Sequence, residues 1–424
     1  MLGFKWRKLA RVRVPAVFAL ALVVGVASVG ASATVSVTNY VAYAGGKAGP
    51  ANGKLSPIKI GYVNQEGGPI VIGKTADNGV DAAVKFVNRF AGGVGGHPVV
   101  LVKCFIASSE EEGQKCGQRF ANDRKIVAVV TGAVAIGTES LYSAIARSKP
   151  VIAGVAVNPV ETVQPNAAIL YGDSRYILAP YATFARDVLK VKSAALVFPE
   201  AAGLDAAAAG QTTAFQAAGI SIKKVSYPAN TADLSAPLVA AGALSADLVM
   251  PVINPNECGK FQKAIQALGI AEEKVLASPI CLTPTTIEEL GDFPKWIYAI
   301  ASSLTIDRTD PAVPPYQAIL KKVGQGKLIG DPWTNVGFGE VLTLVKFLNA
   351  LGPTKITTAG ILRQMKAFKG PMVLGSPSIR CGKYAKAPAV CNDYTQFYRY
   401  GGQGAFKKAG DWVPPPKGWV APSG

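Results

Sequence analysis

Histidine is almost absent from this sequence, since His97 is the only one among 424 residues. Serine–histidine or cysteine–histidine catalysis would therefore have to use His97, which follows a glycine cluster and precedes an apolar run. The G-x-S-x-G motif of α/β-hydrolases and the H-E-x-x-H motif of zinc proteases are also missing. The pair Glu288–Glu289 is typical of solvated charges near a helix end. These absences favour a binding protein over an enzyme.

Charged residues are also scarce, at 17% of the chain, while hydrophobic residues reach 49%. This balance is that of a globular protein slightly shifted toward apolar residues, and the length fits two or three domains. The formal net charge is +17, but the basic residues are scattered and form no dense run. Such a surface suits an anionic cell envelope and does not indicate nucleic-acid binding.

The first 33 residues have the pattern of a secretory signal peptide. Five basic residues precede an apolar run from Val14 to Val29, and a small-x-small site ends at Ala33. We expect cleavage after Ala33, with Ala44 as the alternative site; an uncleaved N-terminal anchor is the competing interpretation. No cysteine directly follows the apolar run, so a lipid attachment point is lacking. Cleavage would export the protein to the periplasm or cell envelope, lower its formal charge from +17 to +12, and leave a linker over residues 34–57.

The chain has six cysteines, an even number that indicates disulfides in an oxidising compartment. Fifteen connectivities are possible for six cysteines. The six fall into three couples that are close in sequence, and we expect these couples to pair: Cys104–Cys116, Cys258–Cys281 and Cys381–Cys391. A zinc site is disfavoured because the chain has no C-x-x-C pair and a single histidine. We therefore expect neither a metal nor another cofactor.

Apolar strands and amphipathic helices alternate along the chain in two successive series. In the first series, we expect strands at 58–63, 99–104, 126–131 and 151–155, with helices at 77–90, from 109 onward, and at 138–147 between them. In the second series, we expect helices at 176–189, 204–218, 234–241 and 257–268, and strands at 194–198, 220–227, 247–253, 275–277 and 296–301. Further helices at 337–352 and 356–368 and a strand at 395–400 follow. Apolar strands separated by helices are typical of parallel sheets covered on both faces. The sequence therefore predicts an α/β protein with two doubly wound parallel-sheet lobes.

The stretch NRFAGGVGGHPVVLVKCF (residues 88–105) contains four glycines in five residues. A dinucleotide-binding G-x-G-x-x-G loop would follow a strand and open a helix, whereas these glycines follow a helix and precede a strand. We expect them to end the helix and turn the chain at positive φ. His97 is then more simply a surface or hydrogen-bonded residue than a chemical group.

Several segments resemble periplasmic leucine/isoleucine/valine-type binding proteins of ABC transporters. The stretch NRFAGGVGGHPVVLVKCF resembles the part of that family that carries an Asn-x-x-Gly-Gly-hydrophobic-x-Gly signature followed by an apolar strand. IVAVVTGAVAIGTES, RSKPVIAGVAVNP, PVINPNECGKFQKAIQALGI and VGFGEVLTLVKFLNALG resemble later segments in the same order. The resemblance spans about residues 58–400.

The resemblance implies the type I periplasmic binding protein architecture, in which three hinge crossovers join two lobes that enclose the ligand. Lobe one would comprise residues 58–174 and 303–394, and lobe two residues 175–302 and 395–424. Crossovers would lie near 171–176, 302–307 and 393–397. The expected ligand-binding residues follow strands at the facing edges of the lobes: Gln65, Glu66, Gly67, Ala133, Ile136, Gly137, Ala156, Val157, Asn158, Glu200, Ala202, Asn254, Asn256 and Ile280.

The polar clamp with which amino-acid binders of this family hold their ligand is mostly missing here. Its hydroxyl positions fall near Ile136 or Gly137 and Val157, its tyrosine positions near Ala202 and Asn254, and its acidic position near Ile280 or Cys281. A zwitterion buried without partners would cost several kcal/mol. We therefore expect a less charged or more apolar small molecule, and a Cys258–Cys281 bridge would tie two of the pocket loops.

The resemblance implies an exported, monomeric solute-binding protein that delivers a small organic ligand to an ABC permease. One alternative is a ligand-sensing module of the same fold that is not coupled to transport. A second alternative is an envelope enzyme on this scaffold, which would depend on acids such as Glu66 or Glu200 in the cleft.

Overall fold

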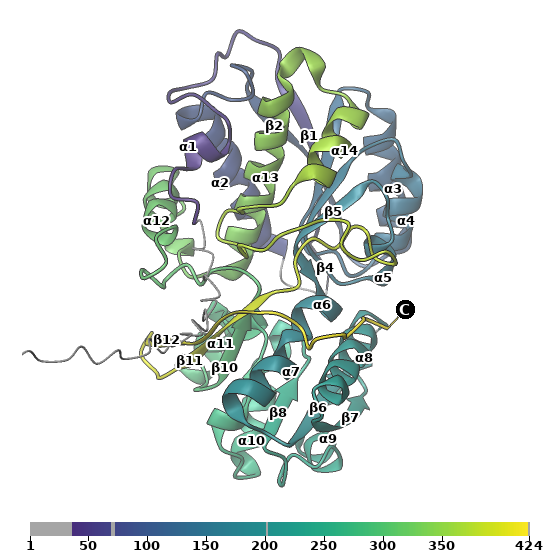
Figure 1. The fold of residues 1–424 in the computed structure, drawn as a ribbon, viewed down its shortest axis with the longest axis vertical. Helices are drawn as coiled ribbons and strands as arrows, with labels where there is room; N and C mark the ends of the chain where they lie inside the picture. The colour runs from purple at the N-terminus through teal and green to yellow at the C-terminus, as the bar shows by residue number, and fades with distance from the viewer. Residues whose placement is uncertain (1–35, 69–72, 201, 423–424) are drawn as a thin grey trace, which may run out of the picture. The chain divides into compact units, whose positions relative to one another are not determined.

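The computed structural model describes residues 36–68, 73–200 and 202–422, which form two lobes (Figure 1). Lobe one contains a five-stranded parallel sheet with the order β2-β1-β3-β4-β5. Its strands are β1 (Ile58–Gln65), β2 (Val99–Ile106), β3 (Ile126–Thr131), β4 (Val151–Ala156) and β5 (Ala167–Asp173). In this order the winding reverses between β1 and β3, and ligands of doubly wound sheets bind at the carboxyl edge.

Helices cover both faces of this sheet. They are α2 (Gly73–Phe90) and α13 (Pro332–Leu351) on one face, and α3 (Glu110–Asn122) and α4 (Thr138–Ile145) on the other. Neighbouring residues of β1 alternate between the two cores: Tyr62 packs with the α2 and α13 side chains, and Val63 with those of α3 and α4. Burial on both faces explains why these strands are apolar throughout, and it confirms the predicted doubly wound arrangement.

Lobe two contains a mixed sheet. Parallel strands in the order β7-β6-β8 continue through a bridge between Val249 and Val275 into the order β9-β10-β11-β12. The strands are β6 (Ser193–Pro199), β7 (Ser221–Tyr227), β8 (Leu248–Pro251), β9 (Leu276–Ala277), β10 (Ile297–Ile300), β11 (Thr395–Tyr400) and β12 (Phe406–Val413). The last two strands run antiparallel. The helices are α8 (Ala202–Ala217), α9 (Ser235–Ala240), α10 (Cys258–Ala267) and α11 (Pro284–Leu290).

The chain passes between the sheets of the two lobes three times. It leaves lobe one after β5, at Asp173, and enters α6 (Ser174–Leu178). It returns after β10 to α12 (Val313–Lys322), whose buried residues pack in the lobe-one core. Val390 still bridges to Ile169 of β5, and the chain then enters β11 in lobe two. These three passages put a hinge beside the carboxyl ends of β5 and β10.

Several elements differ from the sequence-based expectations. The single helix expected over 176–189 is wrong: α6, α7 (Pro180–Phe184) and a π-helix (Ala185–Leu189) occupy this region, because Pro180 cannot donate a backbone hydrogen bond. Helix α13 begins at Pro332, five residues before the expected start, since Asp331 accepts a hydrogen bond from the Thr334 N–H as its N-cap. Strands β5 and β12 and helix α12 were not anticipated.

The short expected features of lobe one are confirmed. Ser109 and Glu112 form the capping box that opens α3. Gly92, Gly93, Gly95 and Gly96 all have positive φ, and a Cβ on Gly93 would lie 2.1 Å from the His97 carbonyl oxygen. The His97 Nδ1 lies 2.8 Å from the Ser56 carbonyl oxygen. These residues shape the turn into β2 and do not contribute to a site.

The three expected disulfides, Cys104–Cys116, Cys258–Cys281 and Cys381–Cys391, are present. The first joins β2 to α3, and the second joins the start of α10 to the 3-10 turn Pro279–Cys281. Each disulfide links segments that already lie next to each other. The two cysteines of the second disulfide come after β8 and β9, whose carboxyl ends face the hinge.

The segment expected to be a linker carries a short helix, α1 (Tyr40–Tyr43), that packs on lobe one. Both tyrosines are buried. The Tyr40 hydroxyl donates to the Ala312 carbonyl oxygen, and the Tyr43 hydroxyl is hydrogen-bonded to the Thr343 hydroxyl at 2.8 Å. Residues 40–43 are therefore part of the lobe-one core, and the proposed signal peptide (1–33) lies outside the described residues.

A chain that starts at Gly45 should be less stable than one that starts at Thr34. It loses two buried tyrosines and two buried hydrogen bonds, which together predict a decrease of at least ~3 kcal/mol in the free energy of unfolding. Urea unfolding of both chains measures this difference, with Tyr43→Phe in the longer chain as the control that removes a hydroxyl alone. Equal stability of the two chains would show that α1 contributes nothing to the core.

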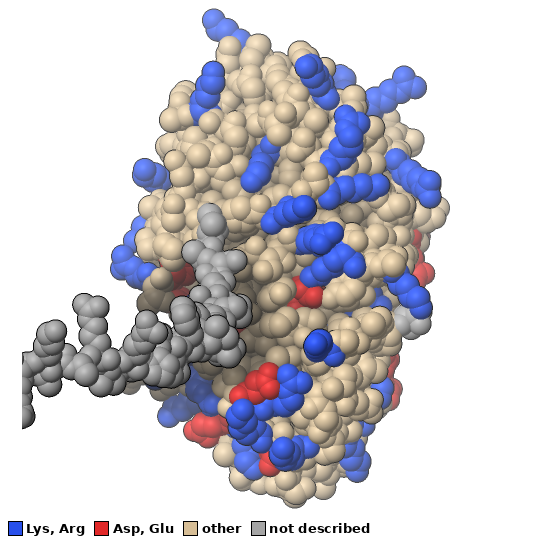
Figure 2. All heavy atoms as spheres, in the orientation of Figure 1, with Lys and Arg blue, Asp and Glu red and all other residues tan. Residues whose placement is uncertain are grey.

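Basic side chains gather on lobe one (Figure 2). From Val341 to Asn392 the sequence has eight lysines and arginines and no acidic residue. Arg363, Lys366 and Lys369, on or just after α14 (Thr358–Ala367), are exposed. Within the described residues, no helix is long and apolar enough to cross a membrane.

Candidate functional site

A cavity of about 150 Å³ lies where the two lobes meet. Most of its wall comes from the carboxyl ends of strands in both lobes. The end of β4 supplies Val155 and Val157, and the ends of β8, β9 and β10 supply residues such as Val252, Ile280 and Ile300. Parallel strands place these ends at one edge of each sheet, so the two edges face the same space.

Among the described residues that line the cavity, none carries a charged side chain. The wall is mainly valine, leucine, isoleucine, proline and alanine, and the remaining polar groups are hydroxyls and one indole, that of Trp333. A charged ligand would have to leave water without an oppositely charged side chain in this wall, which costs several kcal/mol. The cavity therefore suits a molecule that is mostly apolar.

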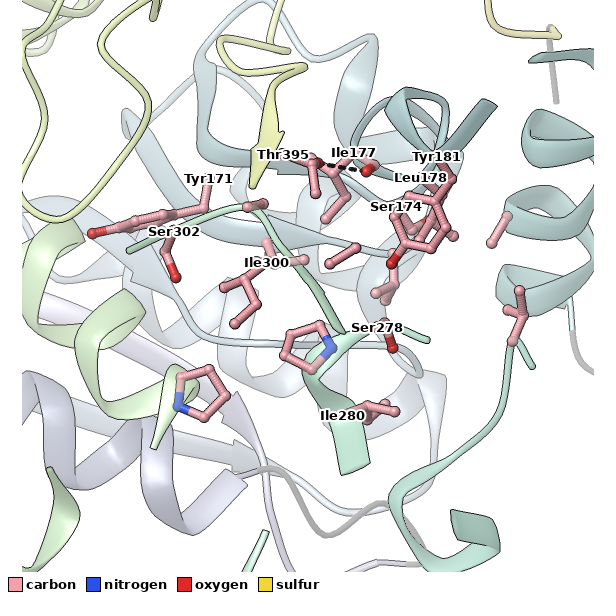
Figure 3. A pocket seen from close by; sticks show the side chains of 18 of the residues that line it. Tyr171, Ser174, Ile177, Leu178, Tyr181, Ser278, Ile280, Ile300, Ser302 and Thr395 are labelled. Carbon is pink, nitrogen blue, oxygen red and sulfur yellow. Dashed lines mark hydrogen bonds between the residues drawn. The ribbon is translucent and has the colours of Figure 1, made fainter. Parts of the chain in front are cut away.

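Helices α6 and α7 supply one wall through a regularly spaced set of residues. Ser174, Ile177, Leu178 and Tyr181 follow the i, i+3, i+4, i+7 spacing of a single helix face, and all four line the cavity. Figure 3 shows Ser174, Leu178 and Tyr181 together on one side of the cavity. The opposite face of α6 carries Tyr176, whose ring packs edge-on against Trp419 near the C-terminus.

Three hydroxyls of the cavity wall are already used by the protein. The Tyr171 hydroxyl donates to the Val373 carbonyl oxygen at 2.7 Å, and the Thr395 hydroxyl donates to the Ile177 carbonyl oxygen at 2.7 Å (Figure 3). Ser302 accepts a hydrogen bond from the Asn335 side-chain amide. These bonds hold β5, β11 and α13 to the hinge, and the three hydroxyls are not first choices for a ligand.

Of the fourteen residues expected to bind ligand, Val157 and Ile280 line the cavity. Gln65 instead holds a loop: its Oε1 accepts from the Ala135 and Ile136 N–H groups, and its Nε2 donates to the Ala107 carbonyl oxygen. Asn158 caps α5 (Pro159–Thr162) and forms a capping box with Glu161. Both amides are thus committed to backbone groups.

The other expected residues whose side chains are described also lie outside the cavity wall. Glu66 lies 3.8 Å from Lys74, Gly137 begins α4 with φ of +81°, and Asn254 forms a capping box with Glu257. Glu200 and Asn256 are exposed, Ala133 and Ala156 are buried, and Gly67 and Ile136 do not line the cavity either. The side chain of Ala202 is outside the described part of the structure. Sequence neighbours of several, such as Leu204 and Ile253, do reach the cavity. No described residue of the expected loops 64–68 and 132–137 lines the cavity, whereas the stretches that follow β4, β6, β8 and β9 each contribute at least one residue to its wall.

The residues that the sequence reasoning missed come from the hinge and from the start of α13. They are the α6–α7 face, Tyr171, and Pro332, Trp333 and Val336. The helical spacing of the α6–α7 face is visible in the sequence. The sequence analysis predicts one helix over 176–189, and nothing in the pattern shows that this face turns toward a cavity.

The connection between β1 and α2 contains a sequence match to the phosphate-binding pattern G-x-x-x-x-G-K-[ST], at Gly68–Thr75. A phosphate loop depends on successive backbone N–H groups, and Pro69 has none. Lys74, which would contact the phosphate, lies 3.8 Å from Glu66. Residues 69–72 lie outside the described residues, so the match does not define a site.

Comparison with solved structures shows the same fold in several binding proteins. A leucine-binding protein from Thermotoga maritima is 17% identical with a TM-score of 0.68, and the alignment covers 84% of this chain and 99% of that one. A fatty acid ABC transporter substrate-binding protein from Thermomonospora curvata is 15% identical with a TM-score of 0.71, covering 89% and 97%. A solute-binding protein from R. palustris in complex with 4-hydroxybenzoate is 17% identical with a TM-score of 0.68, covering 85% and 98%.

A family model described as periplasmic binding protein matches residues 57–400. No match is found among curated proteins. The likeness to solved structures establishes the fold, and the family match extends over most of the chain. The predicted resemblance to leucine/isoleucine/valine-type binding proteins is thereby confirmed, and the chain belongs to the periplasmic binding protein family.

Proposed function

We propose that this protein is exported, captures a small and weakly polar organic molecule between its lobes, and delivers it to an ABC permease. The observation that supports this proposal is the cavity between the two lobes, since the described residues of its wall carry no charged side chain. The solved relatives differ widely in their ligands, since one is described with isoleucine, another with benzoate and a third as a fatty acid binder. The cavity chemistry of this chain is thus a better guide to its ligand than any one relative.

A zwitterionic amino acid fits this cavity poorly. Its carboxylate and ammonium would both lose water, and the wall offers hydroxyls and backbone groups in return. A medium-chain or aromatic molecule with one polar group would instead gain ~25 cal/mol for each Å² of apolar surface removed from water. We therefore favour a ligand of that kind over a branched-chain amino acid.

A thermal-shift screen tests this ligand class. The panel contains leucine and valine, medium-chain alcohols, amides and acids, and aromatic alcohols, amides and acids. A ligand present at 100 times its Kd stabilises the folded protein by about 2.7 kcal/mol, so the best binder should raise Tm clearly. We expect that binder to be a weakly polar compound, and a larger Tm increase with leucine or valine than with every other compound would contradict the proposal.

Delivery to a permease would use the outer surfaces of the lobes, because the cavity is enclosed between them. The exposed basic side chains of lobe one suit an acidic partner surface. Uptake of the best binder of the panel, in cells that lack this protein, should be restored by the complete chain. Normal uptake in cells that lack the protein would show that uptake does not depend on it, and would favour the sensing role.

A further inference from the structure

Two hydroxyls of the α6–α7 face have no partner within the described residues. The Ser174 Oγ is buried and makes no hydrogen bond. Tyr181 is 2% exposed, and no described group bonds its hydroxyl. Burial raises the pKa of Tyr181, so its hydroxyl stays protonated and remains a donor. A buried hydroxyl without a partner costs about 1–3 kcal/mol, which a ligand that supplies the partner would recover.

A third hydroxyl, that of Ser278, lines the cavity from lobe two and makes no capping hydrogen bond to the 3-10 turn that Ser278 precedes. Ser278 follows β9, whereas Ser174 and Tyr181 belong to the hinge helices. In Figure 3, Ser278 lies on the same side of the cavity as Ser174 and Tyr181, whereas Tyr171 and Ser302 lie at the other end. The cavity therefore has a hydroxyl-bearing end with open hydrogen-bonding capacity and an otherwise apolar wall.

The charged side chains next to this end of the cavity, Asp173 and Arg175, form an ion pair with each other. The Arg175 Nε donates to the Asp173 Oδ1 at 2.9 Å, and the other guanidinium nitrogens donate to Thr162, Asp173 and the Pro422 carbonyl oxygen. Both side chains of the pair are buried. Neither is among the residues that line the cavity. Among the described residues, a ligand carboxylate at this end would therefore find hydroxyl donors and no free cation.

We infer that the ligand's polar group is uncharged (a hydroxyl, carbonyl or amide) and that Tyr181 and Ser174 receive it, with Ser278 contributing from lobe two. The ligand class is then a neutral molecule with an apolar body and one hydrogen-bonding end. This inference rests on the proposed function, since it names the ligand chemistry of the same cavity. It also assigns a distinct role to each wall, because the strand ends bind the apolar body and α6–α7 orient the polar end.

Isothermal titration calorimetry with matched compounds tests the inference. The probes are octanamide, 1-octanol and octanoate, and benzamide and benzoate, at pH 8 where both acids are ionised. We expect each amide to bind at least ~10-fold more tightly than the carboxylate of the same skeleton, since ~1.4 kcal/mol of unpaired charge gives that ratio. Tyr181→Phe and Ser174→Ala should each weaken amide binding by about 3- to 10-fold, as expected for a lost neutral hydrogen bond.

Tyr176→Phe is the matched control, because Tyr176 lies on α6, as Ser174 does, but packs against Trp419 and Tyr384 outside the cavity. It should leave all affinities unchanged. Carboxylates that bind more tightly than their amides, or equal effects of Tyr181→Phe and Tyr176→Phe, would overturn the inference. Suppose that carboxylates bind and that a variant with a charge placed in the cavity wall loses this binding. The ligand then binds in this cavity, so the proposed function stands and this inference fails. If neither series binds, the inference and the proposed ligand class both fail.

Discussion

Replacing Ile280 by aspartate is expected to raise the Kd of the best binder of the ligand panel at least ~100-fold, which corresponds to about 2.7 kcal/mol. Ile280 lines the cavity from the 3-10 turn after β9 and is only half-buried in this structure. A carboxylate at this position would lose water when the ligand covers it, and the wall residues that the structure describes include no cation to compensate. The folded protein without ligand should tolerate the change, because the side chain keeps part of its contact with solvent.

Ile287→Asp is the matched control for this experiment. Ile287 is on α11, seven residues further along the chain, is 42% exposed, and does not line the cavity. It should alter neither the Kd nor Tm by much, since surface substitutions usually change stability by less than ~0.5 kcal/mol. Equal affinities of Ile280→Asp and the unchanged protein would mean that the ligand binds somewhere other than this cavity.

The alternation of strands and helices was predictable because the apolar strands are buried on two faces, and the amphipathic helices, such as α2 and α3, are buried mainly on one. Element β5 was missed because only the four-residue helix α5 separates it from β4, whereas the pattern led us to expect a long helix between parallel strands. Element α12 was missed because Pro314 and Pro315 look like helix breakers, although they lie in its first turn, where proline is tolerated. Strand β12 is a partly exposed edge strand with a glycine and two lysines, so its sequence lacks an apolar run.

The site was predictable to the level of strand ends and not of side chains. A search of those loops for polar residues favoured Gln65, Asn158 and Asn254, and the structure uses all three to hold loops or cap short helices. The apolar neighbours that line the cavity, such as Val155 and Ile253, could not be distinguished from core residues by sequence. In this protein the apolar side chains of these loops indicated a weakly polar ligand, because the polar clamp that would hold an amino acid was missing from the sequence.

Replacing Glu340 is the second substitution with a large expected effect, and this effect is on the free energy of unfolding. It lies on α13 one turn after the cavity residue Val336, and its side chain is fully buried. Neither carboxyl oxygen accepts a well-formed hydrogen bond, although the backbone of Gly154 lies close enough to favour the ionised form slightly. Burial raises the pKa of Glu340 well above its ordinary value. The sequence could not show this, because α13 is buried on nearly every side and a charged residue on it has no exposed face.

Glu340→Met should therefore stabilise the protein, by about 2 kcal/mol at pH 8, because it removes a buried polar group that lacks partners. A carboxyl whose pKa is higher in the folded than in the unfolded chain stabilises the fold when protonated, and that stability declines as pH rises above about 4.5. The gain from Glu340→Met should thus be small at pH 5 and grow toward pH 8. Urea unfolding at both pH values measures it, and a loss of stability at both would contradict the prediction.

Glu161→Met is the matched control, since burial raises the pKa of Glu161 as well, to about 8. Unlike Glu340, Glu161 accepts hydrogen bonds from the Val157 and Asn158 N–H groups and from the Tyr142 hydroxyl. Its replacement leaves these donors without a partner, so the same substitution should destabilise the protein by ~1–3 kcal/mol. Opposite signs for the two variants would show that hydrogen-bonding partners, and not burial alone, decide what a buried carboxyl costs this fold.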